Sequence, residues 1–126
     1  MKIILVDAAN TFTIEGKIHE ELYELLESYS NKKIILTNAN DEQMVQFGLT
    51  NLSYELFTLK HSPDKVDPEY FKEMLKKFNL NKDDVIYFEH NPDAVESAKS
   101  VGINTYHYNA EKRDLNSLKN FLDGNL

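Results

Sequence analysis

At 126 residues the chain has the usual length of one folded domain, and it is long enough to bury one continuous hydrophobic core. Its 41% hydrophobic and 28% charged residues exclude an intrinsically disordered protein, and a formal net charge of -7 excludes nucleic acid as a favoured partner. The absence of cysteine excludes disulfides and thiolate metal sites, and the N-terminal apolar run ends at Asp7, so we expect a cytoplasmic protein with no membrane association.

Five short apolar segments, rich in β-branched and aromatic residues, predict the strands of the fold. In chain order they cover residues 3–6, 34–36, 56–59, 85–88 and 103–108. Apolar residues with helical spacing lie between them at 18–29, 44–47, 71–78 and 95–98, and a last helix is expected at 114–122. This alternation predicts an α/β protein with a three-layer, doubly wound (Rossmann-like) core around a five-stranded parallel sheet.

Local signals mark where the predicted helices begin and end. Asp67-Pro68 and Asn91-Pro92 each place an acceptor side chain before a proline, which is typical of a helix start. Gly48 and Gly102 follow helical segments and favour the left-handed backbone of a C-terminal cap. Both kinds of signal agree with the helices expected from the spacing of apolar residues.

The segment after the first strand departs from the alternation. Residues 11–18 contain Glu15-Gly16 between short β-prone pairs and predict a small hairpin, a flap beside the sheet. No linker, repeat or low-complexity tract interrupts the chain. We therefore expect one domain over residues 1–126.

Polar side chains follow three of the predicted strands at the point where each strand ends. Asp7 ends the first strand, Thr37 and Asn38 end the second, and Glu89 and His90 end the fourth. Ligands of open parallel sheets bind outside the carboxyl ends of the strands, where the strand order reverses. These five residues are therefore the first candidates for a site.

Four segments resemble, in chain order, the motifs of the haloacid dehalogenase (HAD) superfamily. Residues 6–12 (VDAANTF) are similar to the first motif, an Asp-x-Asp-x-Thr segment after a buried strand. Residues 35–38 (ILTN) are similar to the second, and residues 65–71 (KVDPEYF) match the Lys-Pro-Asp-Pro-Glu-x-Phe form of the third except for one valine. Residues 86–92 (IYFEHNP) resemble the fourth, acidic motif. The resemblance covers nearly the whole chain.

The resemblance implies a site for phosphoryl transfer. Asp7 holds the position of the nucleophile, which forms an aspartyl-phosphate that water then hydrolyses. Thr37 matches the hydroxyl that binds a phosphoryl oxygen, and Lys65 matches the cation that neutralises the transferring group. With Asn38 beside them, Thr37 and Lys65 are the expected phosphate-binding residues.

Several positions depart from the family pattern. Ala9 replaces the second Asp of the first motif, so the usual proton donor and acceptor is missing. His90 stands at the principal metal-ligand position and Ala94 at the downstream acid, so only Glu89 remains acidic in register. The family resemblance implies Mg²⁺, held here by Asp7, the backbone carbonyl of Ala9, Glu89 and His90. An imidazole at that position favours a transition metal instead.

The spacing of the motifs leaves no room for a cap domain, because core elements use all the residues between them. We therefore expect a capless HAD protein with a site open to solvent. Its expected partner is a phosphorylated small molecule or a phosphoprotein, and a second protein could cover the open site, because the domain itself does not exclude water.

Two functions follow from these observations. The first is a HAD-like hydrolase, a phosphohydrolase acting through an aspartyl-phosphate on Asp7, with weak activity because catalytic positions are replaced. The alternative is a catalytically inactive pseudo-phosphatase that binds a phosphorylated ligand or a protein partner at the same rim. A phospho-receiver domain is the least favoured function, because the phosphorylated Asp of such domains follows the third strand, whereas Asp7 follows the first.

The remaining histidines and tyrosines carry no clear signal for chemistry. His19, His61 and His107 lack ligand-like spacing, so no role is assigned to them. Tyr87 is expected to pack in the core, as aromatic residues of strands do. Two interpretations of His90 stay open: it is a metal ligand, or it is a residue at the start of a helix with no role in the site.

Overall fold

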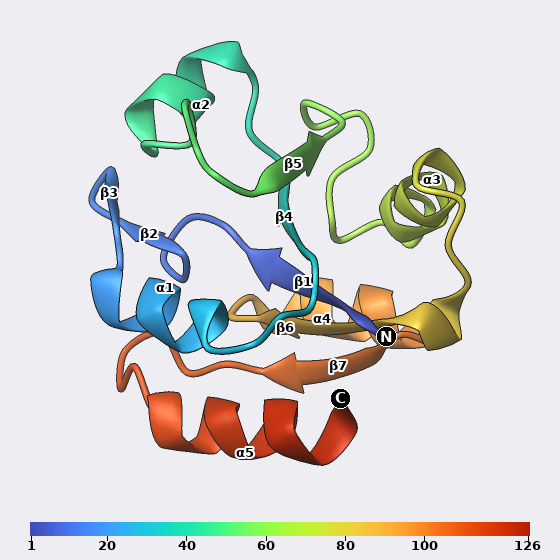
Figure 1. Cartoon of the computed structure of the whole chain (residues 1–126). Helices are drawn as coiled ribbons and strands as arrows, with labels where there is room; N and C mark the ends of the chain where they lie inside the picture. Colours follow the sequence, from blue (N-terminus) through green and yellow to red (C-terminus); the bar gives the residue numbers. More distant parts are fainter.

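The computed structural model describes all 126 residues and contains one five-stranded parallel sheet (Figure 1). In spatial order the strands are β5 (Glu55–Thr58), β4 (Lys33–Thr37), β1 (Ile3–Asp7), β6 (Val85–Glu89) and β7 (Asn104–His107). All five predicted strands are present, each within one residue of its predicted ends. The strand order reverses at the central strand β1, which pairs with β4 on one side and β6 on the other.

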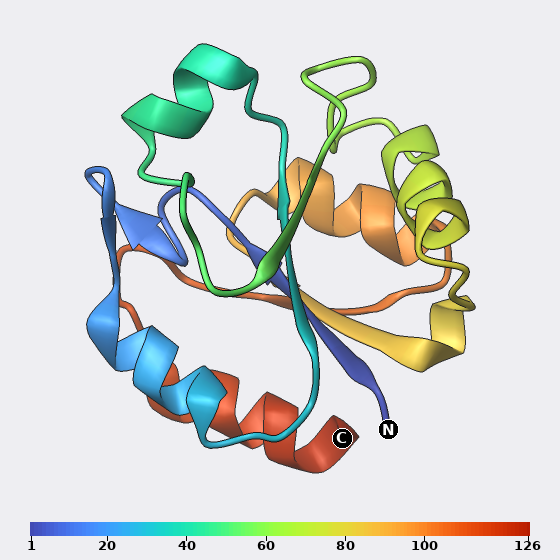
Figure 2. The same ribbon diagram turned by 45° about the horizontal axis from the view of Figure 1, so that its top comes forward.

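Two layers of helices cover the sheet, as Figure 2 shows. One layer holds α1 (Glu20–Glu27) and α5 (Leu115–Asn125), and the opposite layer holds α3 (Glu69–Lys77) and α4 (Pro92–Ser100). Alternate side chains of β1 enter the two layers, because successive residues of a strand point to opposite faces. Ile4 and Val6 pack with the first layer, and Leu5 packs with the second. The predicted three-layer α/β fold is therefore confirmed.

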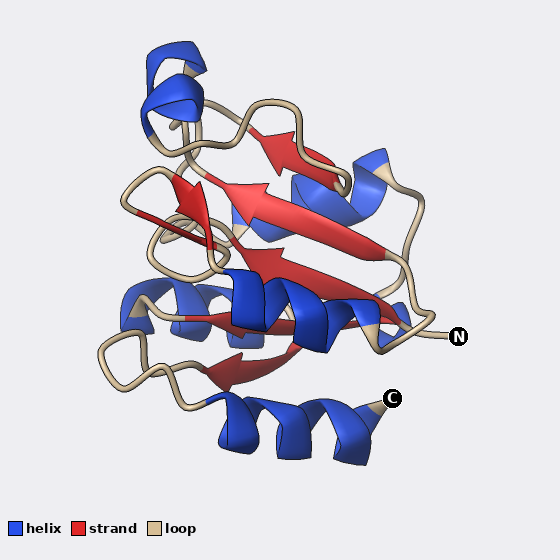
Figure 3. Ribbon diagram, turned by 60° about the vertical axis from the view of Figure 1, so that its left-hand side comes forward, coloured by secondary structure: helices blue, strands red, loops and turns tan.

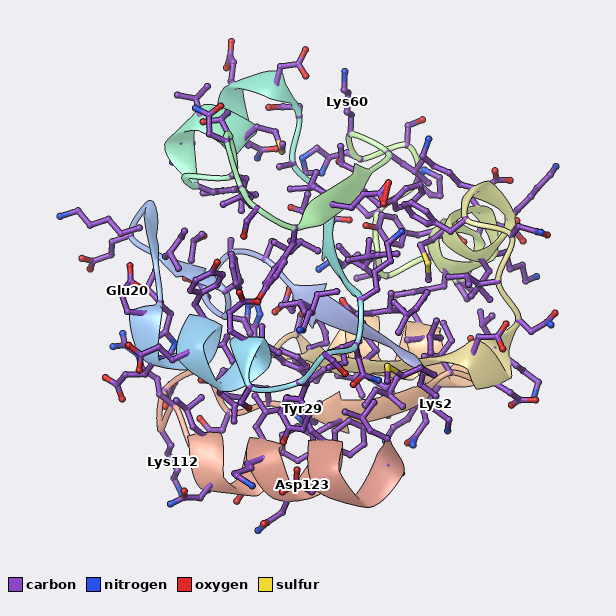
Figure 4. The ribbon with its side chains drawn as sticks, in the orientation of Figure 1. Lys2, Glu20, Tyr29, Lys60, Lys112 and Asp123 are labelled. Carbon is purple, nitrogen blue, oxygen red and sulfur yellow. The ribbon has the colours of Figure 1, made fainter.

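The helices α1 and α5 lie side by side on their face of the sheet. Each buries a leucine pair four residues apart, so each presents one apolar stripe to the sheet: Leu22 and Leu26, and Leu118 and Leu122. At the edge of this contact the hydroxyl of Tyr29 donates to Oδ1 of Asp123 at 2.6 Å (Figure 4).

None of the five helices combines the length and the hydrophobicity needed to cross a bilayer.

The capping signals are borne out with one shift. Asn91 caps α4, since its side chain accepts the backbone N–H of Asp93 at 2.9 Å and Pro92 is the first helical residue. The predicted start of α3 was one residue early. The first helical hydrogen bond of α3 runs from the backbone N–H of Lys72 to the carbonyl of Pro68. Pro68, and not Asp67, is therefore the N-cap residue.

The flap and α2 meet beyond the carboxyl ends of the strands, the side to which the arrowheads point in Figure 3. The predicted flap is present as β2 (Thr13–Ile14) and β3 (Lys17–Ile18), and α2 spans Asp41–Gln46. Gly48 follows α2 with a φ of +67°, and a Cβ on it would lie 2.1 Å from the carbonyl oxygen of Gly16. The turn of the flap therefore packs directly on the end of α2. A short 3-10 turn, Lys82–Asp84, precedes β6.

Candidate functional site

A buried lysine joins the carboxylates that end two neighbouring strands. Asp7 ends β1 and Glu89 ends β6, and both side chains are almost fully buried. Nζ of Lys65, from the segment before α3, lies 2.8 Å from Oδ1 of Asp7 and 2.9 Å from Oε1 of Glu89. Burial by itself lowers the pKa of Lys65, but the two carboxylates outweigh it and hold that pKa above its usual range. Lys65 is therefore a permanent cation at this rim.

His90 supplies a second cation to the same carboxylates. Its backbone N–H donates to Oδ2 of Asp7 at 3.2 Å, its ring Nδ1 contacts the same oxygen, and Nδ1 lies 3.3 Å from Oε2 of Glu89. These hydrogen bonds to Asp7 and Glu89 raise the pKa of His90 to about 10. Burial raises the pKa of Asp7, but Lys65 and His90 overcome it and hold that pKa well below its usual range. Two anions thus face two cations.

Three further groups donate hydrogen bonds to the two carboxylates. The hydroxyl of Thr11 donates to Oδ2 of Asp7 at 2.7 Å, and the backbone N–H of Asn91 donates to Oε2 of Glu89 at 3.0 Å. The hydroxyl of Tyr87 donates to Oε1 of Glu89 at 2.5 Å. Tyr87 is buried in the core as expected, and it also has this polar role, which was not expected. Burial raises the pKa of Tyr87 and Glu89 raises it further, so its hydroxyl remains a donor.

Thr37 and Asn38 continue the rim at the end of β4. Oγ1 of Thr37 accepts the backbone N–H of Ala39 at 3.2 Å. Oδ1 of Asn38 accepts the backbone N–H of Lys65 at 2.7 Å, which ties the segment before α3 to the end of β4. Because this oxygen already accepts a hydrogen bond, the NH₂ group is the part of the Asn38 side chain that can donate to a ligand.

A cavity of about 250 Å³ opens over these residues. Its lining includes every site residue expected from the sequence, which are Asp7, Ala9, Thr37, Asn38, Lys65, Glu89 and His90. This volume is just below the usual range of ligand pockets, so the part of a ligand that enters the cavity is small. The structure thus gathers the expected residues in one place, while their roles remain predictions.

The cavity is also lined by residues that the sequence analysis did not assign to the site. His61, Gln43, Phe47 and Asn91 line it with the expected residues. His61 and Gln43 come from the loop before α3 and from α2, and they touch each other at the mouth of the cavity. No motif or spacing marks this pair in the sequence.

Three of the lining residues form a group that suits a metal ion. One ligand atom each of Asp7, Glu89 and His90 lies within 4.8 Å of the others. Two carboxylates and an imidazole fit a transition metal in donor type, and they fit Mg²⁺ poorly because Mg²⁺ requires oxygen ligands. Ala94 lines the cavity where the family places a further acid, and the neighbouring Asp93 is exposed and outside the cavity lining. A metal here would therefore have fewer oxygen ligands than in the HAD pattern.

Comparisons with known proteins agree with the fold. A family model described as haloacid dehalogenase-like hydrolase matches residues 6–107, and no curated protein matches the chain. A HAD family enzyme from Bacteroides thetaiotaomicron, an aspartate-to-alanine mutant in complex with magnesium and inorganic phosphate, superposes with a TM-score of 0.63. It is 13% identical, and the match covers 87% of this chain and 95% of that one.

Two further solved structures are similar. The core domain of a candidate phosphoglycolate phosphatase from Streptococcus pneumoniae is 18% identical with a TM-score of 0.57, covering 85% of this chain and 79% of that one. A candidate β-phosphoglucomutase from Thermotoga maritima is 26% identical with a TM-score of 0.52, covering 70% of this chain. This match covers 44% of the Thermotoga protein, so the likeness extends over less than half of that relative.

Proposed function

This chain belongs to the haloacid dehalogenase-like hydrolases, and we propose that it is a phosphohydrolase that works through an aspartyl-phosphate on Asp7. The observation that carries the proposal is the position of Lys65, whose ammonium lies between Asp7 and Glu89 at the floor of the cavity. A buried carboxylate kept ionised beside a fixed cation is suited to attack a phosphoryl group. The substrate class is a phosphorylated small molecule or a phosphoprotein.

Each residue of the cavity has a separate role in phosphoryl transfer. A carboxylate oxygen of Asp7 attacks phosphorus, and Lys65 offsets the negative charge that gathers on the transferring group. The hydroxyl of Thr37 and the amide of Asn38 donate to phosphoryl oxygens and hold the group in line. A transition metal bound by Asp7, the carbonyl of Ala9, Glu89 and His90 would add positive charge at the same place.

We propose that activity is weak, for two reasons that the lining residues give. Ala9 lies in the cavity where the family has an acid, so that position provides no proton for the leaving group. His90 and Ala94 replace acids, which leaves Glu89 as the acid of the fourth motif and alters the metal. General acid–base groups typically contribute about 10²- to 10⁴-fold, so a change at this position lowers turnover without removing binding.

The second candidate function is a pseudo-phosphatase that binds a phosphorylated ligand or a protein partner. It is supported by the balance of charge, because Lys65 and His90 already neutralise Asp7 and Glu89. A rim of this kind can bind an anion through Thr37 and the amide of Asn38 with no reaction. We also propose a single capless domain, with a site that a protein partner could cover.

A phosphatase assay with a panel of phosphate esters and divalent metals tests the first function. We expect slow hydrolysis by the native chain and none by an Asp7→Asn variant, which removes the nucleophile with little change in size. The matched control is Asp93→Asn, since Asp93 is exposed and lies outside the cavity lining. Saturable phosphate binding with no hydrolysis that depends on Asp7 would favour the pseudo-phosphatase.

A further inference from the structure

The ring of His61 is fixed at the mouth of the cavity by contacts at both nitrogens. Nδ1 lies 2.7 Å from Oδ1 of Asp64, and Nε2 lies 2.5 Å from Oε1 of Gln43. The side chain is 41% exposed, yet it lines the same cavity as Asp7. The backbone holds the ring here with a φ of +68°, a conformation that non-glycine residues adopt at some cost and that recurs at functional sites.

The neighbours of His61 place an acceptor oxygen against each ring nitrogen. Oε1 of Gln43 also accepts the backbone N–H of Asn40 at 3.0 Å, within the capping box that starts α2. Turning the amide over would place its NH₂ group against that N–H, so the oxygen must face both donors. Nε2 of His61 therefore carries a proton. Nδ1 lies against the carboxylate of Asp64, an acceptor that suits an N–H at that nitrogen.

A proton on Nε2 is thus available at the mouth of the cavity. Two charged residues near His61 are Lys60, which is labelled in Figure 4, and Asp41 at the start of α2. They pair with each other, since Nζ of Lys60 lies 3.1 Å from Oδ1 of Asp41. Asp64 is therefore the carboxylate that holds the ring, and Gln43 is a neutral acceptor that a ligand oxygen could replace.

The geometry of phosphoryl transfer brings the leaving group toward this proton. The attacking and leaving oxygens lie roughly in line on opposite sides of phosphorus. Asp7 is only 3% exposed and attacks from within the cavity, so the leaving oxygen points toward solvent. His61 lines the same cavity and is 41% exposed, which places it on the solvent side. Ala9, at the family's position for the proton donor, has no proton to give.

We infer that His61 is the general acid of this site and replaces the donor that is missing at position 9. The inference rests on the proposed phosphohydrolase function. The oxygen of Asp7 forms a bond to phosphorus as the bond from phosphorus to the leaving oxygen breaks. The electron pair of that bond takes the proton of His61 Nε2 and gives a neutral alcohol. The ring, which keeps its hydrogen bond from Nδ1 to Asp64, is then neutral.

The second half of the reaction restores the ring. Water attacks phosphorus of the aspartyl-phosphate, and the neutral Nε2 accepts a proton from that water as the bond to Asp7 breaks. Inorganic phosphate leaves and His61 again carries both protons. Asp64 is a positioning residue in this scheme, since its carboxylate contacts Nδ1 and fixes the orientation of the ring.

Leaving-group dependence tests the inference, because a general acid matters most for poor leaving groups. We would measure kcat/KM for 4-nitrophenyl phosphate and for a series of alkyl phosphates with native chain and His61→Gln. The expected result is a loss of about 10²- to 10⁴-fold for alkyl phosphates and less than about tenfold for 4-nitrophenyl phosphate. The retained aryl activity also shows that the variant is folded. Asp64→Asn should give the same pattern with a smaller loss.

The matched control is His19→Gln, since His19 precedes α1 and its side chain makes no capping bond. This variant should leave the rates with all substrates unchanged. Equal losses for aryl and alkyl phosphates in His61→Gln, or no loss, would overturn the role of His61 while leaving the phosphohydrolase function in place. Absence of all turnover that depends on Asp7 in the native chain would instead reject the phosphohydrolase function and the role of His61 with it.

Discussion

The imidazole of His90 and the carboxylate of Asp7 are in direct contact, with the ring Nδ1 and the backbone N–H of His90 both facing Oδ2. With Lys65 on the other oxygen, the buried carboxylate lies between two cations. The family pattern places an acid and a metal where this imidazole lies. The electrostatics of the rim therefore depend on the proton that His90 carries.

That proton makes stability depend on pH. The contacts in the fold raise the pKa of His90 from its ordinary 6.5 to about 10, so its contribution to stability is fully present below pH 6.5 and is lost as the pH rises toward 10. We expect the difference in unfolding free energy between the native chain and His90→Gln to fall by about 2 to 4 kcal/mol over this window. Denaturant unfolding at several pH values measures it, and a constant difference would contradict the contact.

Metal binding should compete with the same proton. Because a ligand imidazole must be neutral, the affinity for Ni²⁺ or Zn²⁺ should rise by up to about tenfold per pH unit between pH 6 and 8. Either metal should bind more tightly than Mg²⁺. Calorimetry at each pH gives the affinities, with His90→Ala as the comparison. If Mg²⁺ binds best, or if His90→Ala has no effect on Ni²⁺, His90 is not a metal ligand.

The contact between the flap and α2 should be sensitive to one methyl group. Gly48→Ala places a Cβ 2.1 Å from the carbonyl oxygen of Gly16 at a positive φ, so we expect a loss of about 2 to 4 kcal/mol in unfolding free energy. The matched control is Gly124→Ala in α5, where a Cβ meets no atom within 4 Å. That change should be neutral or stabilising by up to about 1 kcal/mol. Equal effects of the two changes would show that the close approach is absent.

Restoring the acids of the family pattern should restore hydrolysis that depends on Mg²⁺. The combined variant Ala9→Asp, His90→Asp, Ala94→Asp should hydrolyse alkyl phosphates faster than the product of the single changes predicts, because residues that act as a unit are not additive. Steady-state rates with and without Mg²⁺ provide the measurement. A folded triple variant no faster than the native chain would mean that the missing acids do not limit activity.

Much of the fold and rim could be predicted because local rules set them. Apolar β-branched runs gave the strands, and the strand-end rule placed Asp7 and Glu89 together. The bond of Tyr87 to Glu89 also had a signal, since residues two apart on a strand share a face. His61 had none, because its position depends on a left-handed loop backbone and on a contact with Gln43, 18 residues earlier.

Nucleophilic attack by Asp7 leaves a phosphoryl group on its carboxylate, and this group can be detected directly. The native chain would be mixed with acetyl phosphate or 4-nitrophenyl phosphate, quenched in acid within the first turnover, digested, and analysed by mass spectrometry. We expect one added phosphoryl group on the peptide that contains Asp7, lost on treatment with hydroxylamine and absent from Asp7→Asn. Turnover with no such adduct on a rapidly quenched sample, or an adduct that persists in Asp7→Asn, would contradict it.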